Sequence, residues 1–161
     1  FAFHIVCNQV SDANRRLYEE LVQNKGNVHW YHNLPLTVCL GIMSHADILI
    51  NLGNKSSNQT PSKVFDYIGT GKPIVNLYSL HDDTSKYYLE KYPNKLNIYE
   101  DNDSLSENVK MFSQFTHEHI GKTVTREELL DLYSEYNSTE VTKETMKTIR
   151  DFVTRRSENG I

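Results

Sequence analysis

The chain has 161 residues, of which 38% are hydrophobic, and its formal net charge is −4. This length suits one domain that buries a core without disulfides or metals. The acidic balance argues against a dedicated nucleic-acid-binding protein, so we expect no nucleic-acid partner. The apolar runs are only a few residues long, which predicts no membrane-spanning helix. We also expect no secretory signal at the start of the sequence.

Two further features concern the start of the chain and its cysteines. The first residue is Phe1 and not Met, so we expect a piece of a longer chain, or a processed one. Cys7 and Cys39 are the only cysteines, and each lies in an apolar segment. They are predicted to be reduced thiols in the core.

Short apolar runs rich in β-branched residues alternate with segments of helical periodicity over the first part of the chain. The runs predict strands at Phe3–Cys7, Val28–Tyr31, Asp47–Leu52, Pro73–Tyr78 and Leu96–Tyr99. The segments between them predict helices, with start or stop signals at Ser11, Lys25–Asn27, Pro35, Pro61 and Gly69–Gly71, and a short helix at Asp82–Glu90.

The rest of the chain is predicted to be helical. Ser104 with Glu107, and Thr125 with Glu128, have the S/T-x-x-E spacing of a capping box, in which each side chain bonds to the other residue's backbone N–H. A last helix is predicted over Ser138–Arg156.

Strands that alternate with helices need crossover connections, which join parallel strands. Parallel sheets carry helices on both faces. We therefore predict the α/β class: one domain over residues 1–161, with a Rossmann-like parallel sheet, helices on both faces and a helical C-terminal tail.

The glycine turn at Gly69–Lys72 does not fit a known phosphate-binding loop. A P-loop requires G-x-x-x-x-G-K-[ST] between a strand and a helix, but Lys72 is followed by Pro73. The turn also leads from a helix into a strand, which is the reverse order. We interpret it as the end of a helix.

Residue types that ligate metals do not gather in a chelating pattern. His29 and His32 lie three residues apart on a predicted strand, so their side chains point to opposite faces. His117 and His119 lie near a helix end with no third ligand beside them. Asp82–Asp83 is interpreted as a helix cap, with a magnesium site as the less favoured alternative. We therefore predict no bound metal.

The stretch Ala46–Tyr78 contains a strand, a polar loop, a helix start and a second strand. In open α/β sheets ligands bind beyond the carboxyl ends of the strands, where the loop Gly53–Thr60 is predicted to lie. Ser62 and Lys63 start the helix, and its first N–H groups favour an anion such as phosphate. One turn further, Asp66 is placed to accept hydrogen bonds from ribose. A solvated lysine and an ordinary surface carboxylate are the alternatives.

These residues resemble the carboxyl-terminal domain of GT-B glycosyltransferases, in the family-4-like group, over roughly residues 3–100. Members carry a pattern of the form "adi.i......PSK.fEYm..GkPiv". This chain supplies it with Ala46–Ile48, Pro61–Lys63, Asp66–Tyr67 and Gly71–Ile74. The resemblance implies the nucleotide-sugar-binding C-terminal half of a longer, two-domain GT-B chain.

The resemblance also implies roles for single residues at the helix start. Ser62 and Lys63 would bind the donor diphosphate, with Lys55 as a further basic group. Asp66 would bind the ribose, where the family usually has Glu.

Other positions would contact the two ends of the donor. The donor sugar would lie near Asn58, Gln59 and Thr60, although Asn58 stands where the family often has a second Glu. The loop of Tyr31, His32 and Asn33 would contact the base.

Two parts of the family's architecture are not matched. The family's domain begins with a strand and a glycine loop followed by Arg and Lys, but Phe3–Cys7 resembles the next strand. The unmatched first strand is central in the order 3-2-1-4-5-6. Phe3–Cys7 and Asp47–Leu52 are therefore not expected to pair, whereas Asp47–Leu52 and Pro73–Tyr78 should be parallel neighbours. The N-terminal acceptor domain is expected to be missing as well.

The implied function is transfer of a sugar from a nucleotide diphosphate sugar, such as a UDP- or GDP-sugar, to an acceptor glycan, lipid or protein. Retention of configuration and no cofactor are expected, no catalytic residue can be named, and the fragment alone is predicted to be inactive. The expected partners are the donor, the acceptor and the missing N-terminal domain, in the cytoplasm or at the inner face of the membrane. The alternatives are a non-catalytic GT-B-like binding or assembly domain, which Asn58 favours, and a nucleotide-sugar epimerase.

Overall fold

The structure is a computed structural model that describes residues 1–7, 11–24, 26–56, 59, 62–100, 105–136 and 138–158. The chain divides into two compact units, Phe1–Ala46 and Asp47–Ile161. The strand pairings in the described ranges are all parallel, which confirms the α/β class. The helix opener Pro61 and the cap Ser104 lie outside the described residues.

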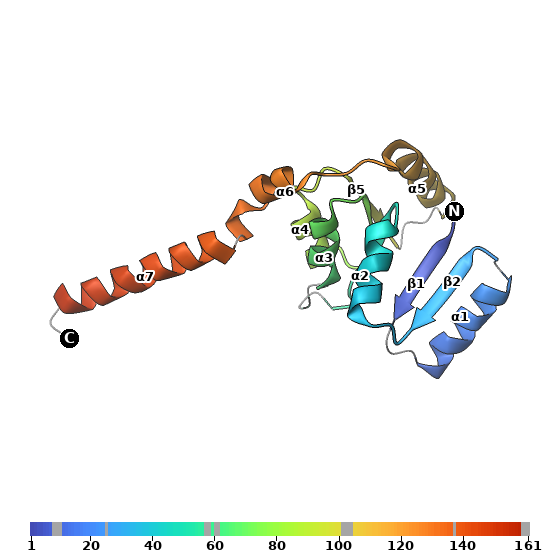
Figure 1. Cartoon of the computed structure of the whole chain (residues 1–161), viewed down its shortest axis with the longest axis horizontal. Helices are drawn as coiled ribbons and strands as arrows, with labels where there is room; N and C mark the ends of the chain where they lie inside the picture. The colour runs from blue at the N-terminus through green and yellow to red at the C-terminus, as the bar shows by residue number, and fades with distance from the viewer. Residues whose placement is uncertain are drawn as a thin grey trace. The chain divides into compact units, whose positions relative to one another are not determined.

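The first unit contains two parallel strands, β1 (Phe3–Cys7) and β2 (Val28–His32), which pair along their whole length. α1 (Asp12–Asn24) connects them and packs against β2 (Figure 1). Ser11 caps this helix as predicted, because its Oγ accepts the N–H of Asn14 at 3.3 Å.

The second helix of this unit, α2 (Leu36–His45), follows Pro35, whose φ of −57° suits the start of a helix. Across β1 and β2, the Nε1–H of Trp30 donates to Cys7 Sγ at 3.0 Å. Cys7 and Cys39 are both free and half-buried. Their half-buried positions differ from the predicted placement inside the core.

The second unit contains a three-stranded parallel sheet in the order β3 (Leu49–Leu52), β4 (Ile74–Tyr78) and β5 (Lys95–Tyr99). α3 (Lys63–Thr70) connects β3 to β4, and α4 (Thr84–Leu89) connects β4 to β5. The two helices lie side by side (Figure 1). The parallel pairing of β3 with β4 is confirmed. Among the described residues, β1 and β3 belong to separate sheets and do not pair, as expected.

Both faces of the three-stranded sheet are covered by helices. On one face, α3, α4 and α6 (Arg126–Leu132) enclose a cluster of buried side chains: Val64, Ile68, Ile74, Leu89, Tyr92 and Val124. On the other face, α5 (Leu105–His119) packs through Phe115 and Phe112 against Val75 and Ile98. Removal of apolar surface from water, at about 25 cal/mol per Å², holds these layers together.

The predicted helical tail is present. Thr125 and Glu128 form the predicted capping box at the start of α6: the Thr125 N–H donates to Glu128 Oε2 at 2.7 Å, and the Glu128 N–H to Thr125 Oγ1 at 3.2 Å. The bonds from Thr125 lower the pKa of Glu128. The short helix η1 (Ser134–Tyr136) and then α7 (Ser138–Glu158) follow.

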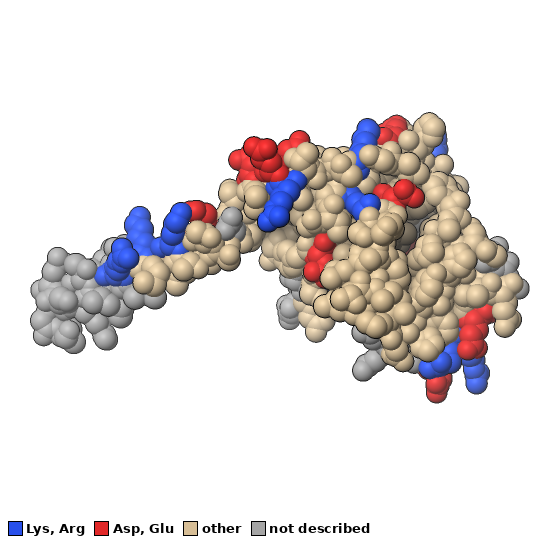
Figure 2. Space-filling view, in the orientation of Figure 1, with Lys and Arg blue, Asp and Glu red and all other residues tan. Residues whose placement is uncertain are grey.

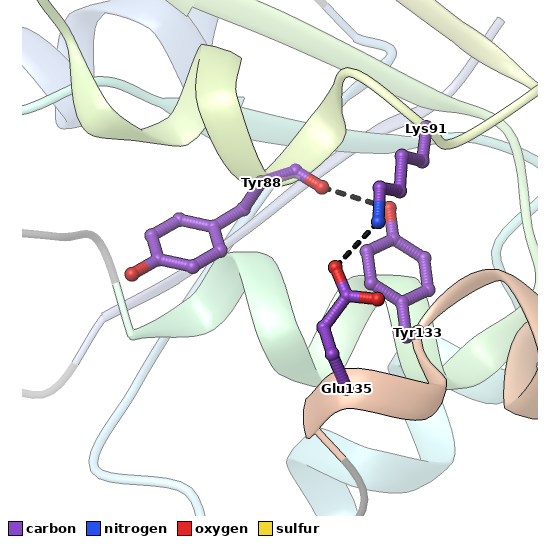
Figure 3. Close-up of polar contacts among 4 residues, drawn as sticks. All are labelled: Tyr88, Lys91, Tyr133 and Glu135. Atoms are coloured by element: carbon purple, nitrogen blue, oxygen red, sulfur yellow. Dashed lines mark hydrogen bonds and ion pairs between the residues drawn. The ribbon is translucent and has the colours of Figure 1, made fainter.

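Two contacts hold η1 and the residue before it against α4 and the turn after it (Figure 3). The Tyr133 hydroxyl donates to the backbone carbonyl of Tyr88 at 2.7 Å, and Lys91 Nζ forms an ion pair with Glu135. Burial raises the pKa of Tyr133 to about 12, with a smaller contribution from the charge of Glu135. A neutral, hydrogen-bonded phenol therefore anchors the start of the tail.

The last helix, α7, carries exposed basic side chains at Lys143 and Lys147, and Figure 2 shows Lys and Arg atoms along the drawn side of this helix. Lys143 Nζ pairs with Glu140 Oε1 at 2.7 Å, one turn away. No helix within the described residues combines the length and the apolar character needed to cross a membrane.

Candidate functional site

The start of α3 brings together the two charged side chains that the sequence singles out. α3 follows the loop that leaves β3, so its first turn lies at the carboxyl-terminal edge of the sheet. Lys63 Nζ lies 3.2 Å from Asp66 Oδ2, and the side chains are 62% and 48% exposed. An exposed pair of this kind contributes about 0–1 kcal/mol. Little free energy is therefore needed to separate the two groups when a ligand binds.

Ser62 precedes this turn with helical dihedral angles, φ −58° and ψ −27°, and in the described part of the chain its hydroxyl makes no capping bond. Its carbonyl accepts the N–H of Phe65 at 3.3 Å. Because the first N–H groups of a helix lack acceptors within the helix, they can bind an anion. The role of Ser62 and Lys63 in binding diphosphate stays a prediction.

A phenol lies next to the charged pair. Burial raises the pKa of Tyr67, while the positive charge of Lys63 lowers it and the negative charge of Asp66 raises it by smaller amounts. Tyr67 therefore stays neutral at physiological pH, and it adds no negative charge that would repel a phosphate.

The loop between β3 and α3 is held at two described points. The backbone N–H of Asn54 donates to Asp83 Oδ2 at 3.1 Å. The carbonyl of Gln59 accepts hydrogen bonds from Asn54 Nδ2 at 2.7 Å and from Thr84 Oγ1 at 3.2 Å. Gln59, which is predicted to lie near the donor sugar, is therefore fixed through its backbone while the residue itself is exposed.

Three asparagines form a row across the sheet, on the face that α4 covers. Asn51, Asn76 and Asn97 are partners in the strand register. Asn51 Nδ2 donates to Asn76 Oδ1 at 2.7 Å, and Asn76 Nδ2 donates to Asn97 Oδ1 at 3.0 Å. Asn51 is 2% exposed and Asn76 is fully buried. Burial of an amide is costly unless its groups are hydrogen-bonded, so the row supplies partners that single asparagines would lack.

The row continues into the start of α4. The Ser85 hydroxyl lies between Asn76 Oδ1, at 3.0 Å, and Asp83 Oδ1, and it donates its hydrogen to one of them. Asp83 is buried, and its Oδ1 accepts the Ser85 N–H at 2.8 Å, so it caps α4. The predicted helix cap at Asp82–Asp83 is confirmed at Asp83.

The residues predicted to contact the base lie in the first unit. Tyr31 ends in a hydroxyl 3.3 Å from His4 Nδ1, and the two rings are stacked. His32 tilts against Trp30 with ring centroids 5.4 Å apart. Asn33 has φ 53°, a left-handed conformation that Asn tolerates better than most residues. The base-binding role of this loop stays a prediction.

The remaining predicted site residues are either exposed or outside the described residues. Lys55 is exposed in the bend after β3. Asn58 and Thr60, predicted near the donor sugar, lie outside the described residues. Within the ranges that the structure describes, no group of three or more His, Cys, Asp or Glu side chains is arranged to hold a metal ion.

Sequence reasoning missed the polar network that supports the loop. The sequence did contain a signal for it, because Asn51, Asn76 and Asn97 each lie between apolar residues at equivalent positions of the three strands. The bond from Asn54 to Asp83 gives no comparable signal, because the two residues are 29 apart in the sequence.

Three comparisons with known proteins were made: a scan against protein-family models, a search of curated proteins and a search of solved structures. None of them found a match for this chain.

Proposed function

We propose that the chain is the donor-binding part of a GT-B-type glycosyltransferase, which binds a nucleotide diphosphate sugar. The observation that carries the proposal is the exposed pair of Lys63 and Asp66, one turn apart at the start of a helix that follows a parallel strand. A cation beside the N–H groups at a helix start suits a diphosphate. A carboxylate one turn further suits the hydroxyl groups of a ribose.

The proposed chemistry is sugar transfer with a nucleoside diphosphate as the leaving group. The bond between the anomeric carbon and the diphosphate oxygen breaks, and a bond to an acceptor oxygen forms. The negative charge that develops on the diphosphate needs donors that are already in place. The N–H groups at Ser62 and Lys63 would stabilise it, together with the side chains of Lys63 and Lys55. Asp66 would hold the ribose through its carboxylate.

Binding would require one rearrangement at the site. In the structure the ammonium group of Lys63 forms an ion pair with Asp66. A diphosphate would take Lys63 away from Asp66, and the freed carboxylate would then accept the ribose hydroxyls. The ion pair is exposed and weak, so the diphosphate and the ribose each gain a strong partner at small cost.

The arrangement of the strands supports the architecture we propose. β3 and β4 are parallel neighbours, and β1 with β2 forms a separate parallel pair. Retention of configuration, an N-terminal acceptor domain, a glycan, lipid or protein acceptor, and a location in the cytoplasm or at the inner face of the membrane belong to the same proposal.

A second candidate is a non-catalytic GT-B-like domain that binds a nucleotide or a partner. The observation that favours it is Asn58, because an amide there lacks the charge of the carboxylate that the resemblance leads one to expect. Such a domain would bind nucleotide through Lys63 and Asp66 but would not release sugar.

The test uses the full-length protein, titrated calorimetrically with UDP and GDP and then incubated with UDP- and GDP-sugars. We expect one of the two nucleotides to bind, and sugar to be released or transferred when an acceptor extract is added. Binding without any transfer would favour the non-catalytic domain. Binding of neither nucleotide would contradict the proposal.

A further inference from the structure

We infer that Asp83 is a positioning residue, which holds the loop between β3 and α3 in the conformation that binds the nucleotide. The inference rests on the proposed function for its ligand, but its geometry is independent of it. Asp83 does not lie on α3 and is not part of the charged pair at Lys63 and Asp66. It acts on that site through the backbone of the loop that leads into α3.

The two oxygens of the Asp83 carboxylate have separate tasks. Oδ1 accepts the Ser85 N–H at 2.8 Å and thereby caps α4. Oδ2 accepts the Asn54 N–H at 3.1 Å and thereby binds the loop. Asp83 is 5% exposed, so both bonds are largely shielded from water. Hydrogen bonds to an ionised acceptor are about twice as strong as those between neutral groups.

The loop is shaped to approach this carboxylate closely. A Cβ placed on Gly53 would clash with Asp83 Oδ2 and would lie 3.0 Å from the Cβ of Tyr78. Only a residue without a side chain therefore fits between β4 and the carboxylate. This close approach brings the next N–H, that of Asn54, onto Oδ2.

Hydrogen bonds also hold the later part of the loop, at Gln59. The Gln59 carbonyl accepts from Thr84 Oγ1 at 3.2 Å and from Asn54 Nδ2 at 2.7 Å. Asp83 and Thr84 are adjacent, so the start of α4 holds the loop at both Asn54 and Gln59. Gln59 precedes the start of α3 by only a few residues, and its position limits where Ser62 and Lys63 can lie.

The asparagine row connects the start of α4, which holds the loop, to the sheet. Asn76 Oδ1 accepts from Asn51 and lies 3.0 Å from the Ser85 hydroxyl. The start of α4 is therefore tied to the centre of the sheet as well as to the loop. Apolar residues of the same shape could stabilise the core as well as these asparagines do. Stability alone therefore does not explain why the row is polar.

The substitution Asp83→Asn separates the two tasks of the carboxylate. Asn is a good N-cap, and its single oxygen can keep the bond to the Ser85 N–H. Its NH₂ group would then face the Asn54 N–H, donor against donor, and the bond to the loop is lost. Asp82→Asn is the matched control, because it removes the same charge from the exposed neighbouring position. Thr84→Val is a second variant, which removes only the hydroxyl that binds Gln59.

The experiment measures two properties of the full-length protein: amide hydrogen exchange at Asn54 by NMR, and binding of UDP or GDP by calorimetry. We expect Asp83→Asn to raise exchange at Asn54 by roughly tenfold, the equivalent of about 1.4 kcal/mol. Nucleotide binding should weaken several-fold in Asp83→Asn and in Thr84→Val. Asp82→Asn should match the wild type in both measurements.

Two results would overturn the inference: exchange at Asn54 that Asp83→Asn leaves unchanged, or faster exchange with unaltered nucleotide affinity. A wild-type protein that binds neither nucleotide would instead contradict the proposed function. The exchange rates of the variants would then still decide whether Asp83 holds the loop.

Discussion

Asn51 Nδ2 donates a hydrogen bond to Asn76 Oδ1 across 2.7 Å inside the sheet of the second unit. Asn76 also donates to Asn97 Oδ1 at 3.0 Å, so it is the central member of a buried row. A row of this kind makes the sheet depend on one amide at its centre, because the loss of that amide leaves buried donors and acceptors without partners.

We therefore predict that Asn76→Leu lowers the free energy of unfolding by about 1–3 kcal/mol, the cost of leaving buried polar groups unpaired. Asn97→Leu is the matched control at the end of the row, where Asn97 is only half-buried, and it should cost less. Urea denaturation of the two variants measures the difference. Equal losses of unfolding free energy in the two variants would contradict the greater importance of Asn76.

Two glycines at the end of α3 should respond to alanine in opposite directions. Gly69 lies within the helix and has free space around it, so Gly69→Ala should stabilise the protein by up to about 1 kcal/mol. Gly71 has φ +72°, and a Cβ there would meet the Val124 carbonyl oxygen. Gly71→Ala should therefore destabilise the protein by more than about 1 kcal/mol. Thermal unfolding checks both signs, and two shifts in the same direction would contradict this account of the turn.

The buried phenol of Tyr133 predicts a loss of stability at high pH. Its pKa is raised to about 12 in the folded protein, above the usual value of 10.0. The corresponding stabilisation is complete below pH 10 and is lost as the pH rises through 12. Urea denaturation between pH 8 and pH 12 should show this decline.

Tyr133→Phe should make the decline less steep, because the variant has no proton to lose at this position. It should also cost about 1 kcal/mol at neutral pH, through the lost bond to the Tyr88 carbonyl. Burial also raises the pKa of Tyr92 above its usual range, so some decline persists in the variant. If stability fell equally steeply with pH in the wild type and the variant, ionisation of Tyr133 would not be a cause of the decline.

The strands were predictable because apolar, β-branched runs mark buried parallel strands. Phe3–Cys7 is observed with the predicted bounds. The third strand begins at Leu49 instead of Asp47, since only Leu49–Leu52 has partners in β4. Parallel pairing followed from the alternation of strands with helices, which leaves no room for hairpins.

The candidate site could be predicted only in part. Lys63 and Asp66 lie three residues apart, a spacing that brings side chains together on a helix, so their contact was within reach of the sequence. The support for the loop could not be predicted, because Asp83 contacts Asn54 only after β3, β4 and α4 have assembled. Long-range polar contacts depend on the register of the sheet, which local patterns do not specify.

The ligand preference of the charged pair tests the central claim most directly. Asp66→Ala removes the proposed ribose acceptor and also frees Lys63 from its ion pair. We predict that this variant binds UDP or GDP more weakly, by about 1–3 kcal/mol, while its affinity for pyrophosphate is unchanged or higher. Lys63→Ala should instead weaken nucleotide and pyrophosphate alike, and reduce the salt dependence of binding.

Calorimetry of the full-length protein and these two variants, with the nucleotide and with pyrophosphate, is the deciding measurement. A nucleotide-specific loss in Asp66→Ala together with a general loss in Lys63→Ala is the result that our account predicts. Folded variants that both bind nucleotide and pyrophosphate as the wild type does would contradict it, and would leave Lys63 and Asp66 as an ordinary surface ion pair.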